Sequence, residues 1–359
     1  MSALGSESFT LIFVTTGWSQ KVVAMGSVKN ARGGQVDHKG DEVRKREDEC
    51  PGKRKFYPHL CDHWVVTKIM KISVITVCRN SAKTIETAFA SVLSQHYSDY
   101  EYLVIDGGSE DGTIDLIKKW EPLFNGRMRW ISEHDEGMYD AINKGIRMAT
   151  GDVVGILNAD DFLSDDRVIE RVAEAFGTTK IDVVYGDVRF IKSPCQGAAV
   201  PELTALRGAK TLRYYSAKRW RPWMLQWGYM PPHPGVYIRR ECFECLGTYK
   251  LGYHIAADYE LLIRYLRKAK LALYYLPCCM VGMRMGGKST KSWRSNLLLN
   301  QEIVRGNREN GYFCCMPMLV PKYAFKVFEF VLPWLLRPPS GRNGECKNGR
   351  QAGGDARKA

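Results

Sequence analysis

The feature that most constrains this chain is an alternation of short apolar strands with amphipathic helical segments, which begins near residue 71. The run Lys71–Val77 is apolar and rich in β-branched residues, and the apolar residues of 85–93 then recur at helical spacing. A second short apolar run, Tyr102–Ile105, completes a strand, helix and strand unit. This alternation is typical of a mostly parallel sheet that carries helices on its faces.

The alternation continues along the chain. It predicts a helix around Ile114 and Ile117, strands at Met128–Ile131 and Val153–Leu157, and helices at Met138–Met148 and Val168–Phe176. Beyond Asp182–Ile191 the pattern is less regular, until a strand at Val236–Ile238 and a helix from Asp258 to about Leu266 restore it. Right-handed crossovers would place the strands in one sheet, so we expect an α/β fold with an open, mostly parallel sheet flanked by helices.

Acidic and polar residues follow successive predicted strands at the points where the strands end. They are Arg79 and Asn80 after the first strand, Asp106 to Thr113 after the second, Glu133 to Asp135 after the third, and Asn158 to Asp161 after the fourth. Open α/β sheets bind ligands in the crevice beyond the carboxyl ends of their strands. We therefore expect these residues to share one site.

The loop after the first strand lacks the glycines of common phosphate-binding motifs. Cys78–Lys83 contains no glycine, which excludes a dinucleotide-binding G-x-G-x-x-G pattern there, and no Walker-type loop occurs in the sequence. Clustered carboxylates indicate instead a divalent cation, Mg²⁺ or Mn²⁺, between the protein and a phosphate group. Asp160 and Asp161 indicate it most strongly, because two acids at a buried strand end repel each other unless a cation neutralises them.

Each of these acids also has a purely structural interpretation. Asp160 or Asp161 would cap a helix that begins near Ser164. Asp106 and Asp111 would accept hydrogen bonds within a glycine-rich turn. The recurrence of acids at successive strand ends favours a ligand site over these alternatives.

Composition divides the chain into four segments. Residues 1–69 are rich in Gly, Ser and charged residues without a sustained period, which predicts a disordered leader. Met70 directly precedes the first strand, so we expect a chain that starts there to fold and function. The main domain is predicted at 70–290, a helical segment that associates with membranes at 291–339, and a disordered tail rich in Gly and Lys/Arg at 340–359.

The formal net charge of +13 favours a polyanionic partner. Arg207–Arg221 contains several basic residues and no acid, and Trp223 and Trp227 follow it, which suits a lipid headgroup surface or a lipid-linked diphosphate acceptor. Single-stranded nucleic acid is an alternative partner, and a solvated loop with core tryptophans is the structural alternative. Tyr312–Leu336 is apolar and aromatic but interrupted by prolines and charges, so we expect it to lie at a membrane interface.

Targeting signals are not evident in the sequence. It contains no run of about 18 consecutive apolar residues and no secretory signal pattern. We expect a cytoplasmic protein that contacts the inner face of the cytoplasmic membrane peripherally.

Four ordered motifs resemble those of family 2 glycosyltransferases. They are Thr76–Asn80, Asp106–Thr113, Ser132–Gly145 and Leu157–Asp161, and their order and spacing match the family over roughly residues 70–290. The resemblance implies a GT-A fold with a Rossmann-like nucleotide-binding half and an acceptor-binding half, a nucleotide-diphosphate sugar donor, a divalent metal, and inversion at the anomeric carbon. The chain most resembles bacterial members that build cell-surface polysaccharide and lipopolysaccharide, which implies a glycan or lipid-linked acceptor.

The resemblance also implies roles for individual residues. Those matched to nucleotide-sugar contacts are Thr76, Asn80, Asp106, Asp111, Asp135, Asn158 and Asp160, and those matched to the metal are Asp160, Asp161 and His233. The chain departs from the family at two positions. Members often have a second Asp where Gly107 stands, and their acidic motif often begins with Asp where this chain has Asn158.

The segment His254–Leu262 resembles the one that holds the family's catalytic base, usually written Glu-Asp. Ala257 occupies the Glu position, and Asp258 remains as the candidate base. The alternative is that Asp258 is only the N-cap of a helix. His233 lies among prolines where close relatives often have a His that binds diphosphate or metal, and a rigid loop residue is the equal alternative.

Two other functional classes explain parts of the sequence. A nucleotidyltransferase would share the sheet and the acids, but it needs a glycine-rich, lysine-containing loop after the first strand. A nucleic-acid-binding α/β protein would use the positive charge, but it gives no reason for acids at successive strand ends. We therefore expect an inverting glycosyltransferase of cell-surface polysaccharide biosynthesis, with no nucleic acid partner.

Overall fold

The computed structural model describes residues 69–178, 180–192, 203–285 and 293–323. Residues 1–68 of the expected leader and the whole expected tail, 340–359, lie outside the described residues, as does the second half of Tyr312–Leu336. The four predicted segment boundaries therefore stay predictions.

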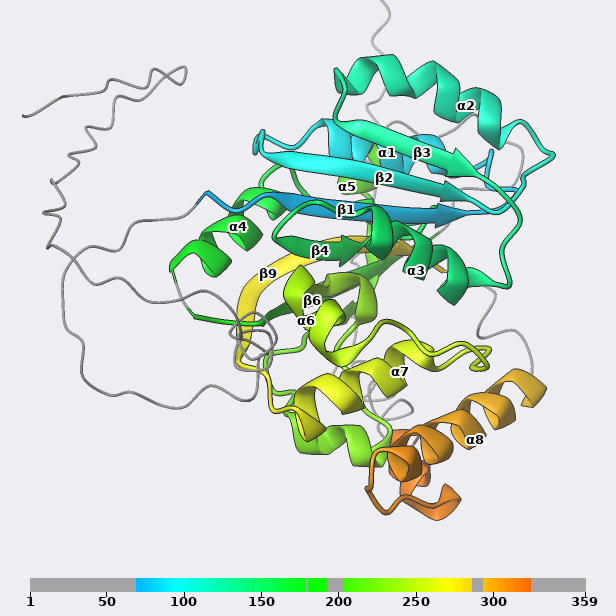
Figure 1. Cartoon of the computed structure of the whole chain (residues 1–359), viewed down its shortest axis with the longest axis vertical. Helices are drawn as coiled ribbons and strands as arrows, with labels where there is room; N and C mark the ends of the chain where they lie inside the picture. The colour runs from blue at the N-terminus through cyan, green and yellow to red at the C-terminus, as the bar shows by residue number, and fades with distance from the viewer. Residues whose placement is uncertain (1–68, 179, 193–202, 286–292, 324–359) are drawn as a thin grey trace, which may run out of the picture. The chain divides into compact units, whose positions relative to one another are not determined.

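The described residues form a mixed sheet with the strand order β3, β2, β1, β4, β8, β6, β9, β5, and β7 pairs with β6 (Figure 1). The first half is parallel and contains β3 (Met128–Ser132), β2 (Tyr100–Asp106), β1 (Ile72–Cys78) and β4 (Val153–Ile156). The second half contains β8 (Val236–Arg239), β6 (Val183–Ile191), β9 (Leu273–Arg284), β5 (Phe162–Leu163) and β7 (Thr211–Tyr215). The predicted α/β fold with an open sheet is confirmed.

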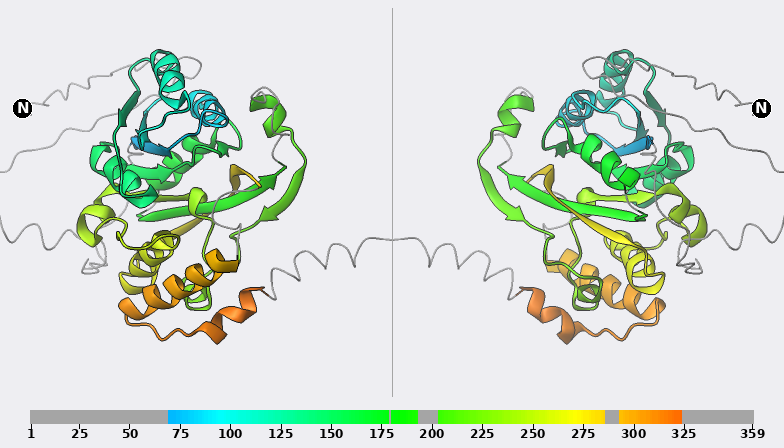
Figure 2. Two further views of the ribbon diagram at one scale, coloured as in Figure 1. Left: turned by 90° about the vertical axis from the view of Figure 1, so that its right-hand side faces the viewer. Right: turned by 90° about the vertical axis from the view of Figure 1, so that its left-hand side faces the viewer.

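Helices cover the faces of the sheet, and further helices pack beside its second half. The α-helices are α1 (Ile85–Leu93), α2 (Thr113–Trp120), α3 (Met138–Met148), α4 (Val168–Thr178), α5 (Leu203–Arg207), α6 (Arg240–Leu246), α7 (Ala257–Leu262) and α8 (Trp293–Glu309). The 3₁₀ turns are η1 (Glu121–Phe124), η2 (Pro222–Trp227), η3 (His233–Gly235) and η6 (Met316–Leu319), and η4 (Ile263–Lys268) is a π-helical continuation of α7. In Figure 2, α8 and η6 lie beside α7 and η2, at the second half of the sheet.

Of the parallel half, β2, β1 and β4 are buried on both faces, which explains why they read as continuous apolar runs, whereas β3 at the edge is only partly buried. In β1, Ile72 and Val74 join the core cluster that contains α1 and α4, whereas Ile75 joins the cluster that contains α3. Figure 1 shows α3 in front of the sheet and α1 behind it. Alternation of side chains along each strand thus supplies both cores.

The ends of the parallel strands lie level with one another. Cys78 pairs with Asp106, and Asp106 pairs with Ser132, so β1, β2 and β3 end in register. The backbone N–H of Leu157 donates to the carbonyl of Ile75 at 2.9 Å, which continues β4 toward the same edge. This register brings the predicted polar strand ends to one edge of the sheet.

The sequence did not predict the long strand β9. It pairs in parallel with β6 and antiparallel with β5, and its register shifts opposite Asp187. Pro277 lies at this irregularity and has no N–H to donate to the ladder. The proline and the interrupted alternation of apolar and polar residues around it explain why the sequence did not indicate this strand.

Two structural alternatives from the sequence are wrong. The helix after the acidic motif begins at Val168, not near Ser164, because Phe162–Leu163 extend as β5. The basic run contains strand β7, and Trp223 and Trp227 are 60% and 39% exposed, so they are not core residues. Of the helices in the described ranges, none has the length and apolarity to cross a bilayer.

Candidate active site

The loops after β1 and β2 are joined by hydrogen bonds into one structural unit. Asn80 adopts a left-handed backbone conformation with φ of 52°, which turns its N–H toward the neighbouring loop. This N–H donates to Ser109 Oγ at 2.7 Å, and the N–H of Glu110 donates back to Asn80 Oδ1 at 2.9 Å. Asn80 thus fixes the two loops against each other.

Asp106 lies at the centre of this unit and is fully buried. Its carboxylate accepts hydrogen bonds from the N–H groups of Gly108 and Ser109 at 3.1 and 2.9 Å, and from the hydroxyls of Ser109 and Ser132. Burial alone would raise the pKa of Asp106, but these hydrogen bonds lower it below its ordinary value. Asp106 is therefore an ionised, internally satisfied group that shapes the turn.

Two other expected nucleotide contacts also use their side chains within the protein. Asp111 accepts from the N–H of Ala82 and from the N–H and hydroxyl of Thr113, which places it at the start of α2. The Thr76 hydroxyl is fully buried and accepts a hydrogen bond from the Tyr102 hydroxyl at 2.8 Å. Contact of Asp111 and Thr76 with a nucleotide stays a prediction. In the structure, their hydrogen bonds stabilise the segments at the ends of the strands.

Three carboxylates surround the end of β1. Burial raises the pKa of the Cys78 thiol, and the negative charges of Asp106, Asp111 and Asp135 raise it further. Asp135 follows β3 and is partly exposed, and its Oδ1 accepts the N–H of Gly137 at 2.9 Å. The third strand end therefore joins the first two, as the sequence predicts.

The acidic motif after β4 contains one buried and one more accessible carboxylate. Asp161 is 2% exposed and accepts a hydrogen bond from Asn158 Nδ2 at 2.8 Å. Burial raises the pKa of Asp161 to about 8, and the charge of Asp160 adds to the effect, while Arg284 opposes it. Asp160 is partly exposed, so it is the carboxylate that a ligand can reach.

The described residues do not bring together three His, Cys, Asp or Glu side chains as a metal-binding group. The predicted set of Asp160, Asp161 and His233 is therefore not assembled, because Asp161 turns toward Asn158 and His233 Nε2 is hydrogen-bonded to the Tyr249 hydroxyl at 2.7 Å. The Asp160 and Asp161 pair still fits a divalent cation, because two adjacent carboxylates supply the oxygen ligands that Mg²⁺ and Mn²⁺ prefer, and Asp160 is accessible. Further ligands would come from a diphosphate and water.

The candidate base Asp258 lies in the first turn of α7 and is partly buried. Its Oδ1 accepts the N–H of Tyr259 at 2.8 Å and lies 3.4 Å from the hydroxyl of Tyr139 on α3. Burial raises its pKa, and the neighbouring His233 opposes this shift. The N-cap of α7 is Ala256, so the interpretation of Asp258 as a mere helix cap is wrong.

Sequence reasoning missed Glu302, which positions the segment that carries Asp258. Glu302 lies on α8, is 5% exposed, and accepts hydrogen bonds from the N–H groups of His254, Ile255 and Ala256 at 2.7, 2.9 and 2.8 Å. A carboxylate at the start of a helix satisfies N–H groups that have no partner within the helix. No local motif marks such a contact, because the two segments lie about fifty residues apart.

An α/β sheet of this strand order, with carboxylates at the ends of its parallel strands, has the architecture of glycosyltransferases with the GT-A fold. The chain belongs to glycosyltransferase family 2, whose model, described as "Glycosyl transferase family 2", matches residues 73–247. It is 30% identical over 200 residues to an uncharacterized glycosyltransferase of Mycobacterium tuberculosis, covering 55% of this chain and 70% of the relative. It is 28% identical over 205 residues to a PGL/p-HBAD biosynthesis glycosyltransferase of Mycobacterium bovis, covering 57% and 73%.

Solved structures of similar arrangement are more distant in sequence. A mannosyltransferase from Pyrobaculum calidifontis, in complex with GDP-Man and Mn²⁺, has 19% identity and a TM-score of 0.49, covering 82% of this chain and 78% of that one. Residues 1–349 of S. aureus TarS, in complex with UDP-GlcNAc, have 16% identity and a TM-score of 0.49, covering 73% of each chain.

Proposed function

We propose that this glycosyltransferase moves a sugar from a nucleotide-diphosphate donor to a glycan or lipid-linked acceptor, with inversion, in cell-surface polysaccharide biosynthesis. The observation that carries the proposal is the set of carboxylates that follow β2, β3 and β4 at one edge of the sheet, together with the contact between Tyr139 on α3 and Asp258 on α7. The contact links the proposed donor half to the proposed base.

The mechanism follows from what each carboxylate can do. Asp160 would hold Mg²⁺ or Mn²⁺, which neutralises the charge of the departing diphosphate when bound. The acceptor oxygen forms a bond to the anomeric carbon as the bond from that carbon to the diphosphate breaks, and the electron pair leaves with the diphosphate. Asp258 takes the acceptor proton. Among the described residues its hydrogen bonds go to Oδ1, which leaves Oδ2 for this proton, and its raised pKa strengthens it as a base.

Replacing the proposed base tests the mechanism. In Asp258→Asn we expect donor affinity within about 2-fold of the wild type and transfer lower by about 10²- to 10⁴-fold. Calorimetry with UDP, GDP and dTDP, with and without Mn²⁺, measures the first quantity, and product formation measures the second. Asp115→Asn is the matched control, since Asp115 is an exposed carboxylate in the first turn of α2. Transfer by Asp258→Asn at close to the normal rate would refute the base assignment.

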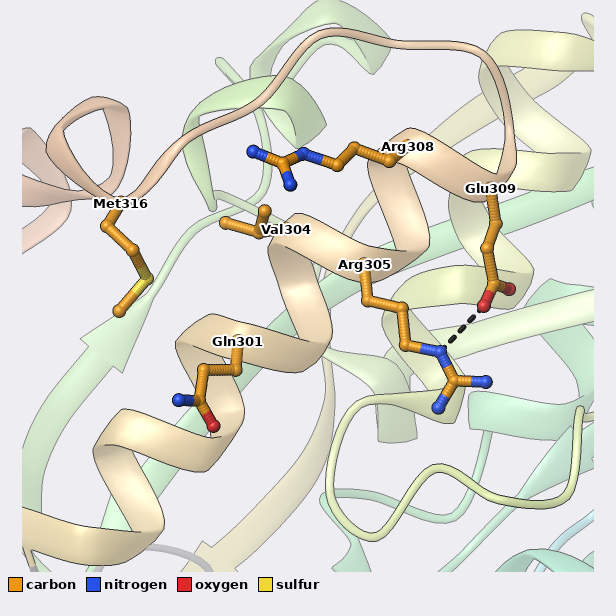
Figure 3. A pocket seen from close by; sticks show the side chains of 6 residues that line it. All are labelled: Gln301, Val304, Arg305, Arg308, Glu309 and Met316. Atoms are coloured by element: carbon orange, nitrogen blue, oxygen red, sulfur yellow. Dashed lines mark hydrogen bonds and ion pairs between the residues drawn. The ribbon is translucent and has the colours of Figure 1, made fainter.

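A surface beside α8 supports the proposed lipid-linked acceptor. The segments around η2 and η6 lie together, because Gln226 Nε2 donates to the carbonyl of Phe313 at 2.7 Å. The exposed large apolar side chains on them are Trp223, Trp227, Phe313, Met316 and Val320. A hollow of about 410 Å³ adjoins them at Met316 and is lined by Gln301, Val304, Arg305, Arg308, Glu309 and Met316, whose side chains Figure 3 shows.

Exposed aromatic groups beside arginines fit the headgroup level of an anionic bilayer, on the inner face of the cytoplasmic membrane. Flotation with anionic vesicles tests this contact. We expect the wild type to float at low salt, and the double variant Trp223→Ala and Phe313→Ala to float several-fold less. Leu123→Ala is the control, because Leu123 is 52% exposed but lies on η1, in the proposed donor half. A wild-type chain that stays unbound at every salt concentration would remove the membrane contact from the proposal.

A further inference from the structure

Of the three carboxylates around the end of β1, one has an oxygen to which no described residue donates a hydrogen bond. Asp106 accepts hydrogen bonds on both of its oxygens, and so does Asp111. Asp135 accepts one, from the N–H of Gly137 to Oδ1, and the described residues offer no donor to its Oδ2. Asp135 is also partly exposed, so its Oδ2 is the oxygen of these three carboxylates that is free to meet a ligand.

Gly107 leaves the space that Oδ2 of Asp135 occupies. A Cβ built on Gly107 would lie 3.2 Å from Asp135 Cγ and closer still to Oδ2, well inside van der Waals contact. The backbone cannot withdraw, because the N–H of Gly107 donates to the carbonyl of Cys78 at 2.9 Å and continues the strand edge. Gly107 is also not among the residues with positive φ, unlike its neighbour Gly108. Position 107 therefore needs glycine for space, and Asp135 fills that space.

The chemistry of Oδ2 selects what can bind there. A carboxylate only accepts hydrogen bonds, so it pairs with a ring N–H and is repelled by a ring nitrogen that carries a lone pair. Uracil, thymine and guanine each present a ring N–H beside a carbonyl. Cytosine and adenine present an unprotonated nitrogen at the equivalent position. A site built on a free carboxylate oxygen thus distinguishes the two groups of bases.

We propose that Asp135 selects the base of the donor, accepting the ring N–H of a uracil, thymine or guanine nucleotide through Oδ2, and that Gly107 is a specificity-determining residue because it holds open the space for this carboxylate. The inference rests on the proposed nucleotide-sugar function and deepens it. It assigns base recognition to the third strand end and loop organisation to Asp106.

Calorimetric titration of the full chain with UDP, dTDP, GDP, CDP and ADP in the presence of Mg²⁺ tests the inference. We expect the wild type to bind at least one of the first three at least 10-fold more tightly than CDP and ADP. In Asp135→Asn, whose amide can donate as well as accept, this preference should fall by about 10-fold or more. Glu136→Gln is the matched control, since Glu136 is the neighbouring exposed carboxylate, and it should keep the wild-type preference.

A second variant tests the steric part. Gly107→Ala should displace Asp135 and, like Asp135→Asn, lower the preference for the uracil, thymine or guanine nucleotide over CDP and ADP. The double variant Gly107→Asp and Asp135→Gly should recover part of this preference, because it supplies a carboxylate from position 107 instead. Thermal unfolding of each variant verifies that it is folded. An unchanged preference in Asp135→Asn, or in folded Gly107→Ala, overturns the inference and leaves the proposed function standing. A wild type that binds none of the five nucleotides overturns both.

Discussion

The hydroxyl of Tyr139 on α3 lies 2.5 Å from the carbonyl of Ile255 and 3.4 Å from Oδ1 of Asp258. The segments that carry Tyr139 and Asp258 are separated by more than one hundred residues, and Tyr139 is 5% exposed. One side chain thus fixes the distance between the helix that follows the third strand end and the proposed base.

Tyr139→Phe should lower transfer without weakening donor binding. The substitution keeps the ring, which stacks on Tyr249, and removes only the hydroxyl. The loss of one hydrogen bond costs about 1 kcal/mol in stability, and the loosened base should lower kcat by about 5- to 20-fold. Steady-state kinetics and thermal unfolding measure both effects. A rise in KM for the donor with kcat unchanged would contradict a positioning role.

Glu302→Gln should impair both stability and transfer. The amide replaces one acceptor oxygen by a donor that faces N–H groups, so at least one hydrogen bond to the start of α7 becomes unfavourable. We expect a loss of about 1 to 3 kcal/mol in the free energy of unfolding. We also expect a reduced kcat, because Glu302 anchors the residues directly before the first turn of α7, which carries Asp258. The same change at Glu244, an exposed helix residue paired with Arg240, should be neutral, and equal effects at the two positions would show that Glu302 has no special role.

The parallel half of the fold could be predicted closely from the sequence, because each of its strands and helices has a clear hydrophobic pattern within its own residues. The helix predicted at Met138–Met148 matches α3, and each buried strand reads as a short apolar run ahead of a polar turn. The grouping of carboxylates around the end of β1 could also be predicted from the sequence, since the ends of parallel strands meet at one edge of the sheet. In the second half, antiparallel pairing and the Pro277 irregularity leave no such regular pattern.

The functions of individual acids were harder to predict than their positions. Sequence alone does not show that Asp106 is enclosed by donors or that Asp135 keeps a free oxygen, because both facts depend on how separate loops meet. Glu302 was missed for the same reason. A motif records which residues recur at strand ends, whereas the hydrogen-bond partners decide which of them can face a ligand.

Asp160→Ala should remove the stabilising effect of a divalent cation on the nucleotide complex. With UDP or GDP present, Mn²⁺ should raise the Tm of the wild type by several degrees, in proportion to the tighter binding, and chelation should reverse this. In the variant the cation should have no effect. Asp165→Ala, at a partly exposed carboxylate that pairs with Arg171 after β5, is the control and should keep the response. A normal Mn²⁺ response in Asp160→Ala would place the cation elsewhere.

Glu101 offers a pH test of stability that does not involve the site, because it lies at the opposite end of β2 from Asp106. Its carboxylate accepts hydrogen bonds from the Ser73 hydroxyl at 2.6 Å, from the N–H and hydroxyl of Thr150, and from Arg129 at 2.8 Å. Burial alone would raise its pKa, but these partners lower it from 4.5 to about 2. The folded pKa is the lower one, so the folded state favours the ionised form.

The contribution of Glu101 is therefore fully present above about pH 4.5 and is lost as the pH falls toward 2. The shift corresponds to about 3 kcal/mol in the free energy of unfolding. Glu101→Gln should unfold more easily than the wild type at pH 7 by about this amount, and the difference should shrink as the pH is lowered through this range. Denaturant unfolding at a series of pH values measures it, with Glu244→Gln as the exposed control. A difference that stays constant from pH 7 to pH 2.5 would show that the hydrogen bonds to Glu101 do not depend on its charge.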